Sequence, residues 1–177
     1  MPRAAIRGAD RTEPNRSAEL KTEEAQSIIG LFKTFVGGHG RITWLERYAA
    51  LTARILIAQI FIISGIMKVL DPAGTAEQME GRGMFWVPFF LWSAALVEIG
   101  GGLLLLAGYK TRLGALLLFL FLIPVTFTFH NFWTYPPAEQ QQQMFNFMHN
   151  FTLMGGLLLL MTFGPGPLSV DLRRKAL

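Results

Sequence analysis

Apolar residues along the chain gather in four long stretches that lack charged side chains. Asp, Glu, Lys and Arg are absent from residues 55–67, 83–97, 113–138 and 140–170. A helix that crosses a bilayer needs about 20 mainly apolar residues. Continuous apolar runs favour helices over the alternating pattern of barrel strands. The pattern therefore predicts four spanning helices, at residues 48–68, 85–108, 112–133 and 145–163.

The basic residues are distributed unevenly among the segments between these helices. Eight of the 16 Lys and Arg residues precede the first helix, Lys110 and Arg112 flank the second connection, and Arg173, Arg174 and Lys175 lie in the tail. The other two connections carry more acidic than basic residues. Because short basic loops stay in the cytoplasm, the sequence predicts an all-α, antiparallel four-helix membrane bundle with both termini cytoplasmic.

The composition agrees with a membrane protein and restricts its chemistry. The 177 residues are 51% hydrophobic and 16% charged, whereas soluble domains average about 25% charged residues. The orientation signal accounts for the net charge of +4, so nucleic acid is not an expected partner. With no cysteine in the chain, disulfides, thiolate zinc sites and cysteine-bound iron–sulfur clusters are excluded. A stand-alone soluble enzyme is not expected.

Residues 1–47 form a predicted N-terminal extension, ahead of a four-helix domain at 48–171 and a basic tail at 172–177. The extension is polar up to about residue 20, which predicts disorder there, and it lacks the pattern of a cleavable signal peptide. Apolar residues then recur at helical spacing, which predicts an amphipathic helix at about 22–36. This helix either binds the inner leaflet or a partner protein, or it packs under its own bundle.

Glu98 is an ionisable residue about 15 Å along the second predicted helix, near the middle of the membrane. Such a group is costly in hydrocarbon, so it faces the bundle interior and marks a functional site. We expect Glu98 to handle protons or to contact a ligand, with Gln59 of the first helix as its hydrogen-bond partner. Lys68 lies too near the end of that helix, unless the second helix is strongly tilted. The alternative is a purely structural hydrogen bond between helices.

Histidine and asparagine side chains gather where the third and fourth predicted helices approach the outer surface. Imidazole and amide groups hydrogen-bond carbonyl oxygens while aromatic rings stack, which is typical of a quinone site. Two histidines at one depth are also compatible with a metal or haem, the less favoured choice. Interfacial anchoring without any ligand is the third possibility. The predicted quinone pocket comprises His130, Asn131, Trp133, His149, Asn150 and Gln59.

Three further features concern packing. Small residues at 64–65, 100–102 and 155–156 predict close contacts between helices. Arg54, near the inner end of the first helix, is expected to extend its charged head towards water. Gln140–Gln143 are expected to form a polar turn between the third and fourth helices.

The ordered set of these segments resembles the DoxX family of small four-helix membrane proteins, over about residues 48–171. Two features depart from the family pattern: His149 stands where a basic residue such as Lys is expected, and the N-terminal extension is long. The resemblance rests on Arg54-Ile55-Leu56, Phe61-Ile62-Ile63-Ser64-Gly65-Ile66-Met67-Lys68, Glu98-Ile99-Gly100-Gly101-Gly102-Leu103, Gly108-Tyr109-Lys110-Thr111-Arg112, His130-Asn131, Asn150 with Gly155-Gly156-Leu157-Leu158, and Gly164-Pro165-Gly166 with Ser169-Val170-Asp171.

The resemblance implies a multi-pass protein of a bacterial or archaeal cytoplasmic membrane. Some family members are linked to quinone-coupled oxidation of sulfur compounds or to other redox assemblies. The first hypothesis is therefore an accessory subunit of a quinone-linked redox complex, with a quinone or quinol pocket near the periplasmic side and Glu98 assisting proton transfer. The second hypothesis is a non-catalytic subunit that stabilises a larger membrane complex through its helix faces and N-terminal extension. Both imply other membrane protein subunits as partners.

Overall fold

The computed structural model describes Leu20, residues 23–29 and residues 44–175. The chain divides into two compact units, residues 1–42 and 43–177. In the first unit, residues 23–29 are helical and fall within the amphipathic helix predicted at about 22–36. The rest of that helix and the predicted disordered stretch at 1–19 lie outside the described residues.

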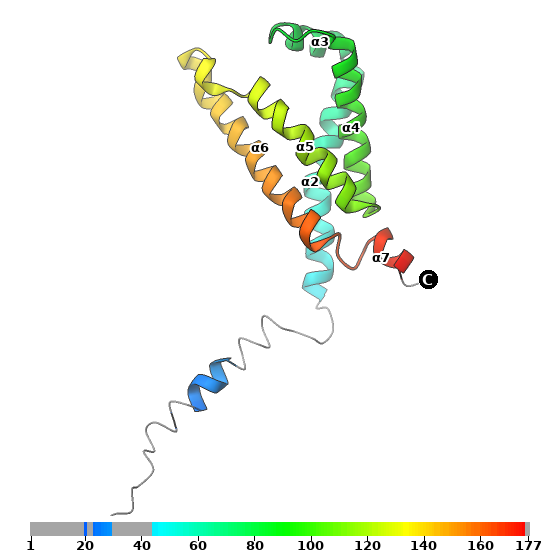
Figure 1. The fold of residues 1–177 in the computed structure, drawn as a ribbon, viewed down its shortest axis with the longest axis vertical. Helices are drawn as coiled ribbons and strands as arrows, with labels where there is room; N and C mark the ends of the chain where they lie inside the picture. Colours follow the sequence, from blue (N-terminus) through cyan, green and yellow to red (C-terminus); the bar gives the residue numbers. More distant parts are fainter. Residues whose placement is uncertain (1–19, 21–22, 30–43, 176–177) are drawn as a thin grey trace, which may run out of the picture. The chain divides into compact units, whose positions relative to one another are not determined.

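The second unit consists of helices, as predicted for an all-α protein (Figure 1). Four of them are long and apolar enough to cross a membrane, which matches the four predicted spans. These are α2 (Trp44–Leu70), α4 (Val87–Ala107), α5 (Thr111–Phe129) and α6 (Pro137–Phe163). The shorter elements are α3 (Pro72–Glu80), the 3-10 helix η1 (Phe132–Thr134) and α7 (Val170–Lys175).

Helix α6 begins eight residues before the span predicted at 145–163. It includes Gln140–Gln143, so the prediction of a polar turn there is wrong. Pro137 occupies the first helical turn and Glu139 lies in the same turn, and both residue types favour a helix start. Glutamine is also a good helix former, so the segment extends the helix instead of ending it.

Small residues bring the helices close together at most of the positions predicted from the sequence (64–65, 100–102 and 155–156). Gly65 of α2 faces Ala95 and Glu98 of α4, where an added Cβ would lie 3.2 Å from the Ala95 carbonyl oxygen. Gly102 of α4 faces α2 in turn, with the Ala58 carbonyl oxygen 3.2 Å from an added Cβ. Gly100, by contrast, faces open space. The α2–α4 contact is therefore tight enough to require glycine on both sides.

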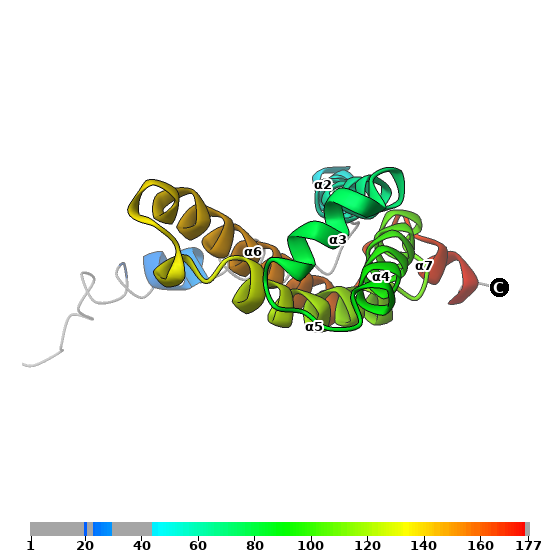
Figure 2. The same ribbon diagram turned by 90° about the horizontal axis from the view of Figure 1, so that it is seen from above.

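The α2–α6 contact is narrow, and the two helices separate towards one end of the unit. Gly156 of α6 packs against Ile57 of α2. Beyond this point the first half of α6 diverges from α2, and both views show the separation (Figures 1 and 2). We call this end, which carries α3 and η1, the α3 end, and the opposite end the α7 end.

Helix α3 packs across the ends of the longer helices and is held there by its N-terminal cap and one apolar contact. Asp71 caps it by accepting a hydrogen bond at Oδ1 from the Gly74 backbone N–H, at 2.9 Å, and Pro72 occupies the first turn. Both are favourable helix starts. Met79 is buried against Val87 and Leu91 of α4. This apolar contact holds α3 over the ends of the longer helices.

The α7 end is closed by the segment that follows α6. Asp171 accepts hydrogen bonds from the backbone N–H groups of Lys110 (2.7 Å) and Thr111 (2.9 Å) and from the Thr111 hydroxyl (3.1 Å). Its own N–H donates to the Gly108 carbonyl at 2.9 Å. A residue 60 positions away thus caps the start of α5 and ties α7 to the α4–α5 turn.

Arg54 also contacts the segment that follows α6. Its side chain is 1% exposed, and its guanidinium donates a hydrogen bond to the Leu168 carbonyl. The prediction that Arg54 extends towards water is wrong, because the chain after α6 folds back over it. Gly108 has a φ of +66°, and any Cβ there would collide with the Arg54 guanidinium.

Candidate functional site

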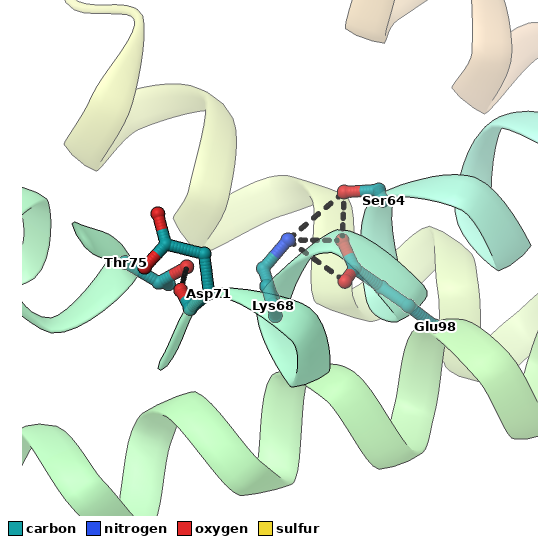
Figure 3. Close-up of polar contacts among 5 residues, drawn as sticks. All are labelled: Ser64, Lys68, Asp71, Thr75 and Glu98. Carbon is teal, nitrogen blue, oxygen red and sulfur yellow. Dashed lines mark hydrogen bonds and ion pairs between the residues drawn. The ribbon is translucent and has the colours of Figure 1, made fainter. Parts of the chain in front are cut away.

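Ser64, Lys68 and Glu98 form a closed triangle of polar contacts between α2 and α4 (Figure 3). Lys68 Nζ lies 2.9 Å from Glu98 Oε2 and 3.1 Å from Oε1. The Ser64 hydroxyl donates to Glu98 Oε1 at 3.0 Å and accepts from Lys68 Nζ at 2.9 Å. Each member of the triangle therefore contacts the other two.

The local sequence explains why these groups meet. Ser64 and Lys68 are four residues apart and so lie on one face of α2. Gly65, beside Ser64, has no side chain, and an added Cβ there would lie 2.6 Å from Ile99 Cγ1 and 3.2 Å from Glu98 Cβ, so glycine allows this part of α4 to approach α2. Lys68 sits one turn further towards the α3 end, a distance that its four-carbon side chain spans.

Two expectations about the partner of Glu98 are corrected here. Lys68, judged too near the end of its helix, forms an ion pair with Glu98. Gln59 does not take this role, because its side chain is exposed on another face of α2. Depth along a helix misled the prediction: the close α2–α4 approach and the length of the lysine side chain decide the pairing.

Burial makes this pair energetically significant. Relative exposure is 6% for the side chain of Glu98 and 19% for that of Lys68. An unpaired carboxylate at such burial costs several kcal/mol, so the ammonium group is the reason an ionised Glu98 is tolerated. The partial exposure of Lys68 places the triangle at the edge of an open space.

That space is a cavity of about 320 Å³ at the α3 end. It lies between the α2–α4 pair and the α5–α6 pair, with α3 above it. Its polar wall includes the whole Ser64–Lys68–Glu98 triangle together with His130 and Asn150. The other lining residues are Ile60, Phe61, Thr75, Gln78, Met79, Ala94, Phe121, Leu122, Val125, Phe129 and Leu153. Two groups of residues that are separate in the sequence therefore share one cavity.

His130 forms a boundary between this cavity and the surface. It ends α5 and also lines a second, wider groove of about 640 Å³ with Arg82 and Tyr135. Its Nδ1 lies 2.9 Å from Gln143 Oε1, which fixes the ring between the two spaces. A group that faces both spaces can relay a proton between them.

Asn150 is held in the cavity wall by a buried hydrogen-bond chain. Its Nδ2 donates to the Thr126 hydroxyl at 3.0 Å, and that hydroxyl donates to the Leu122 carbonyl at 2.6 Å. The side chain is 8% exposed. Because these bonds orient the amide, Asn150 presents a fixed polar surface on the α6 side of the cavity.

The remaining members of the predicted pocket lie elsewhere. His149 is exposed while Asn150 is buried, since consecutive helical residues point about 100° apart. Trp133 is 55% exposed and packs edge to face against Phe132 and Phe147. Asn131 is half-buried outside the cavity lining. The two histidines do not meet in this cavity, so the geometry gives no support to a ligand held between them.

Sequence reasoning missed Ser64, Lys68 and the residues contributed by α3. Ser64 was interpreted as a packing residue, and Thr75, Gln78 and Met79 received no role. A signal was available for the first two, because a hydroxyl and an ammonium four residues apart mark one polar helix face. For α3 the signal was Asp71-Pro72, a typical helix start between two spanning segments.

Comparison with known proteins identifies relatives of this chain. The DoxX family profile matches residues 49–131. The chain is 43% identical to inner membrane protein YqjF of Escherichia coli over 129 residues, covering 72% of this chain and 92% of that protein. It is 31% identical to inner membrane protein YphA of the same organism over 123 residues, covering 70% and 88%.

A third relative comes from yeast. ER-derived vesicles protein ERV29 of Saccharomyces cerevisiae is 33% identical over 84 residues, 48% of this chain and 27% of that protein. No solved structure matches the chain. The extent of similarity to the two inner membrane proteins, together with the four apolar helices, indicates a multi-pass inner-membrane protein. The chain belongs to the DoxX family.

Proposed function

We propose that this protein binds a quinone or quinol head group in the cavity at the α3 end, as an accessory subunit of a quinone-linked redox complex. One observation carries the proposal: an ion pair, a histidine and an oriented asparagine line the same cavity inside an apolar helix bundle. A few converging polar groups in a largely apolar pocket are typical of small-molecule sites.

The residues present fit such a head group. Lys68, Ser64 and His130 carry N–H or O–H groups that hydrogen-bond carbonyl oxygens. Ile60, Phe61, Phe121 and Leu153 supply apolar contact for a ring. The cavity volume of about 320 Å³ is at the lower end of the range for ligand pockets, about 300–1,000 Å³, which suits a single ring.

The proposed role of the protein residues is to hold the head group and to move protons. When bound, a quinone supplies the exchange of two electrons and two protons. Glu98 accepts and releases a proton at the cavity edge, with Lys68 stabilising its ionised form. His130 passes protons between the cavity and the wider groove. The electrons come from the redox centre of a partner subunit, since this chain has no cysteine to bind an iron–sulfur cluster.

The charge distribution supports an orientation for this chemistry. Basic residues dominate the N-terminal extension, the α4–α5 turn and the tail. By the positive-inside rule, the bundle is antiparallel, both termini are cytoplasmic and the α3 end faces the periplasm. Protons taken up through His130 for quinone reduction would then come from the periplasmic side.

The test is quinone retention by the purified full-length protein in native lipid. We expect the wild type to retain quinone, and Glu98→Gln and His130→Ala to lower its content at least fivefold without loss of the folded protein. Gln59→Ala is the matched control, because this exposed residue belonged to the pocket predicted from sequence and lies outside the cavity. A wild type that neither carries quinone nor binds added quinone contradicts the proposal.

The non-catalytic scaffold is then the alternative that stands. It predicts that cavity variants leave partner association unchanged and that deletion of residues 1–40 abolishes it. Affinity purification from the native membrane measures both. Intact association after the deletion would remove that role from the N-terminal extension.

A further inference from the structure

The cavity is partly open rather than fully enclosed. Helices α4 and α5 close its back through Ala94, Leu122 and Val125, and α3 covers it with Thr75 and Met79. Helices α2 and α6 form its flanks. Gly156 of α6 contacts Ile57 of α2, and beyond this contact the two helices stand apart towards the α3 end (Figure 2).

The edges of this opening are apolar and face outward. On α2 the neighbours of the cavity residue Ile60 include Ile63 and Met67, which are 58% and 60% exposed. On α6 the cavity residue Leu153 is half-buried, whereas Leu159, beyond Gly156 towards the α7 end, is 60% exposed and lies outside the opening. In a chain whose long helices cross a bilayer, exposed apolar side chains at this depth contact lipid. The opening therefore faces hydrocarbon.

His149 lies at the edge of the opening. It precedes Gly156 by seven residues, so both lie on the same face of α6, and Gly156 faces α2. At the level of His149 the two helices have separated, and its imidazole is exposed. A polar group in contact with lipid alone is costly, so a position beside the opening of a polar cavity is more favourable for this side chain.

The charges lining the cavity balance each other. Lys68 and Glu98 form an ion pair, and the other polar lining residues are an imidazole, an asparagine, a glutamine, a threonine and a serine. Such a wall favours a head group without net charge. The volume of about 320 Å³ accommodates one ring and no long chain, so an attached chain must pass through the opening.

We propose that the cavity opens sideways into the bilayer between α2 and α6, and that its ligand is a neutral amphipathic molecule whose apolar chain lies in this opening. The ligand half of this inference rests on the proposed function, since the head group is taken to be a quinone. The position of the opening follows from the helix geometry and is tested without any ligand.

The first test measures which solvent reaches the opening. The chain has no cysteine, so a nitroxide attached at Leu153→Cys has no background. In liposomes, we expect the ratio of collisions with oxygen to collisions with a water-soluble nickel chelate to lie within about twofold of that at Leu159→Cys. The ratio at Glu77→Cys, an exposed position of α3 outside the cavity lining, should be at least fivefold lower. A ratio at Leu153→Cys equal to that at Glu77→Cys would place the opening towards water. Exclusion of both reagents would mean that protein covers it, and either result overturns the inference.

The second test separates the chain from the head group. We expect Met67→Trp, which narrows the opening at its α2 edge, to weaken binding of a quinone with a long isoprenoid chain at least tenfold and of the chainless quinone less than threefold. Leu159→Trp, on the lipid face of α6, is the control and should change neither. Equal loss for both compounds would show that the chain does not lie in the opening. If the wild type binds neither compound, the proposed function and the ligand half fail, while the collision ratio still decides the position of the opening.

Discussion

The two ends of this helix bundle use buried polar groups in opposite ways. At the α7 end, Arg54 donates to a backbone carbonyl and Asp171 caps α5, so these groups are consumed in holding the chain together. At the α3 end, Lys68, Glu98 and His130 line a cavity. Helices α2 and α6 contact each other near Gly156 and diverge towards the second end (Figure 1). One end therefore uses its buried polar groups for stability, whereas the other leaves them lining a cavity.

The largest expected effect is that of Gly108→Ala at the α7 end. Gly108 has a φ of +66°, and its Cβ would collide with the buried Arg54 guanidinium. Left-handed strain and overpacking each cost about 1–3 kcal/mol, so the free energy of unfolding should fall by about 3 kcal/mol or more. Thermal or SDS-induced unfolding in micelles measures the loss.

Gly83→Ala is the matched control for that variant. Gly83 also has a positive φ, +72°, but an added Cβ meets nothing within 4 Å. It should therefore show the backbone strain alone, about 1–2 kcal/mol. Equal losses in the two variants would mean that the contact with Arg54 adds nothing to the closure of the α7 end.

The second prediction concerns the ion pair at the α3 end. Lys68→Met leaves Glu98 buried without its ammonium partner, which for fully buried pairs costs about 3–5 kcal/mol. Because Lys68 is 19% exposed, we expect about 2 kcal/mol. Adding Glu98→Leu should recover most of this loss, since no buried charge then remains. The same double variant should retain no quinone. A double variant that retains as much quinone as the wild type would contradict the role of the pair.

Asp171→Ala tests the capping of α5 by the chain after α6. Loss of a helix cap typically costs about 1 kcal/mol, up to about 2, and here the carboxylate also tethers α7 through the Lys110 and Thr111 N–H groups. We expect a loss of about 1–2 kcal/mol with unchanged quinone binding. A clear loss of quinone at unchanged stability would contradict the assignment of stability to the α7 end and of quinone binding to the α3 end.

The smallest effect on stability is expected for His130→Ala. His130 is half-buried and its ring contacts Gln143, so its removal should change the free energy of unfolding by less than about 1 kcal/mol. Quinone retention should nevertheless fall at least fivefold. The free energy of unfolding and quinone retention should be measured on one preparation. Asp171→Ala should lower the first and leave the second unchanged, the reverse of His130→Ala.

Much of the fold could be predicted from the chain alone. The spacing of charged residues identified the four apolar helices, because the bilayer sets both their length and their composition. The same reasoning failed for Gln140–Gln143, where helix propensity and Pro137 extend α6. It also failed for Arg54, since its partner, the Leu168 carbonyl, lies 114 residues away.

The candidate site was predicted only in parts. Glu98 was identified because an ionisable group inside an apolar helix is costly. Its partner was predicted to be Gln59 from the depth of that residue in the membrane. Depth along a helix does not show which face of the helix meets α4, so this prediction was wrong. His149 was grouped with His130 on position alone, although one step along a helix turns the side chain by about 100°.

The sequence by itself determined that this protein has four membrane-crossing helices, a costly carboxylate within one of them, and no thiol chemistry. Only the tertiary structure decided that Glu98 pairs with Lys68 and shares a cavity with His130 and Asn150. The physical reason is that composition and periodicity act along one helix. A site between helices depends on where glycines such as Gly65 allow close approach and where α2 and α6 separate.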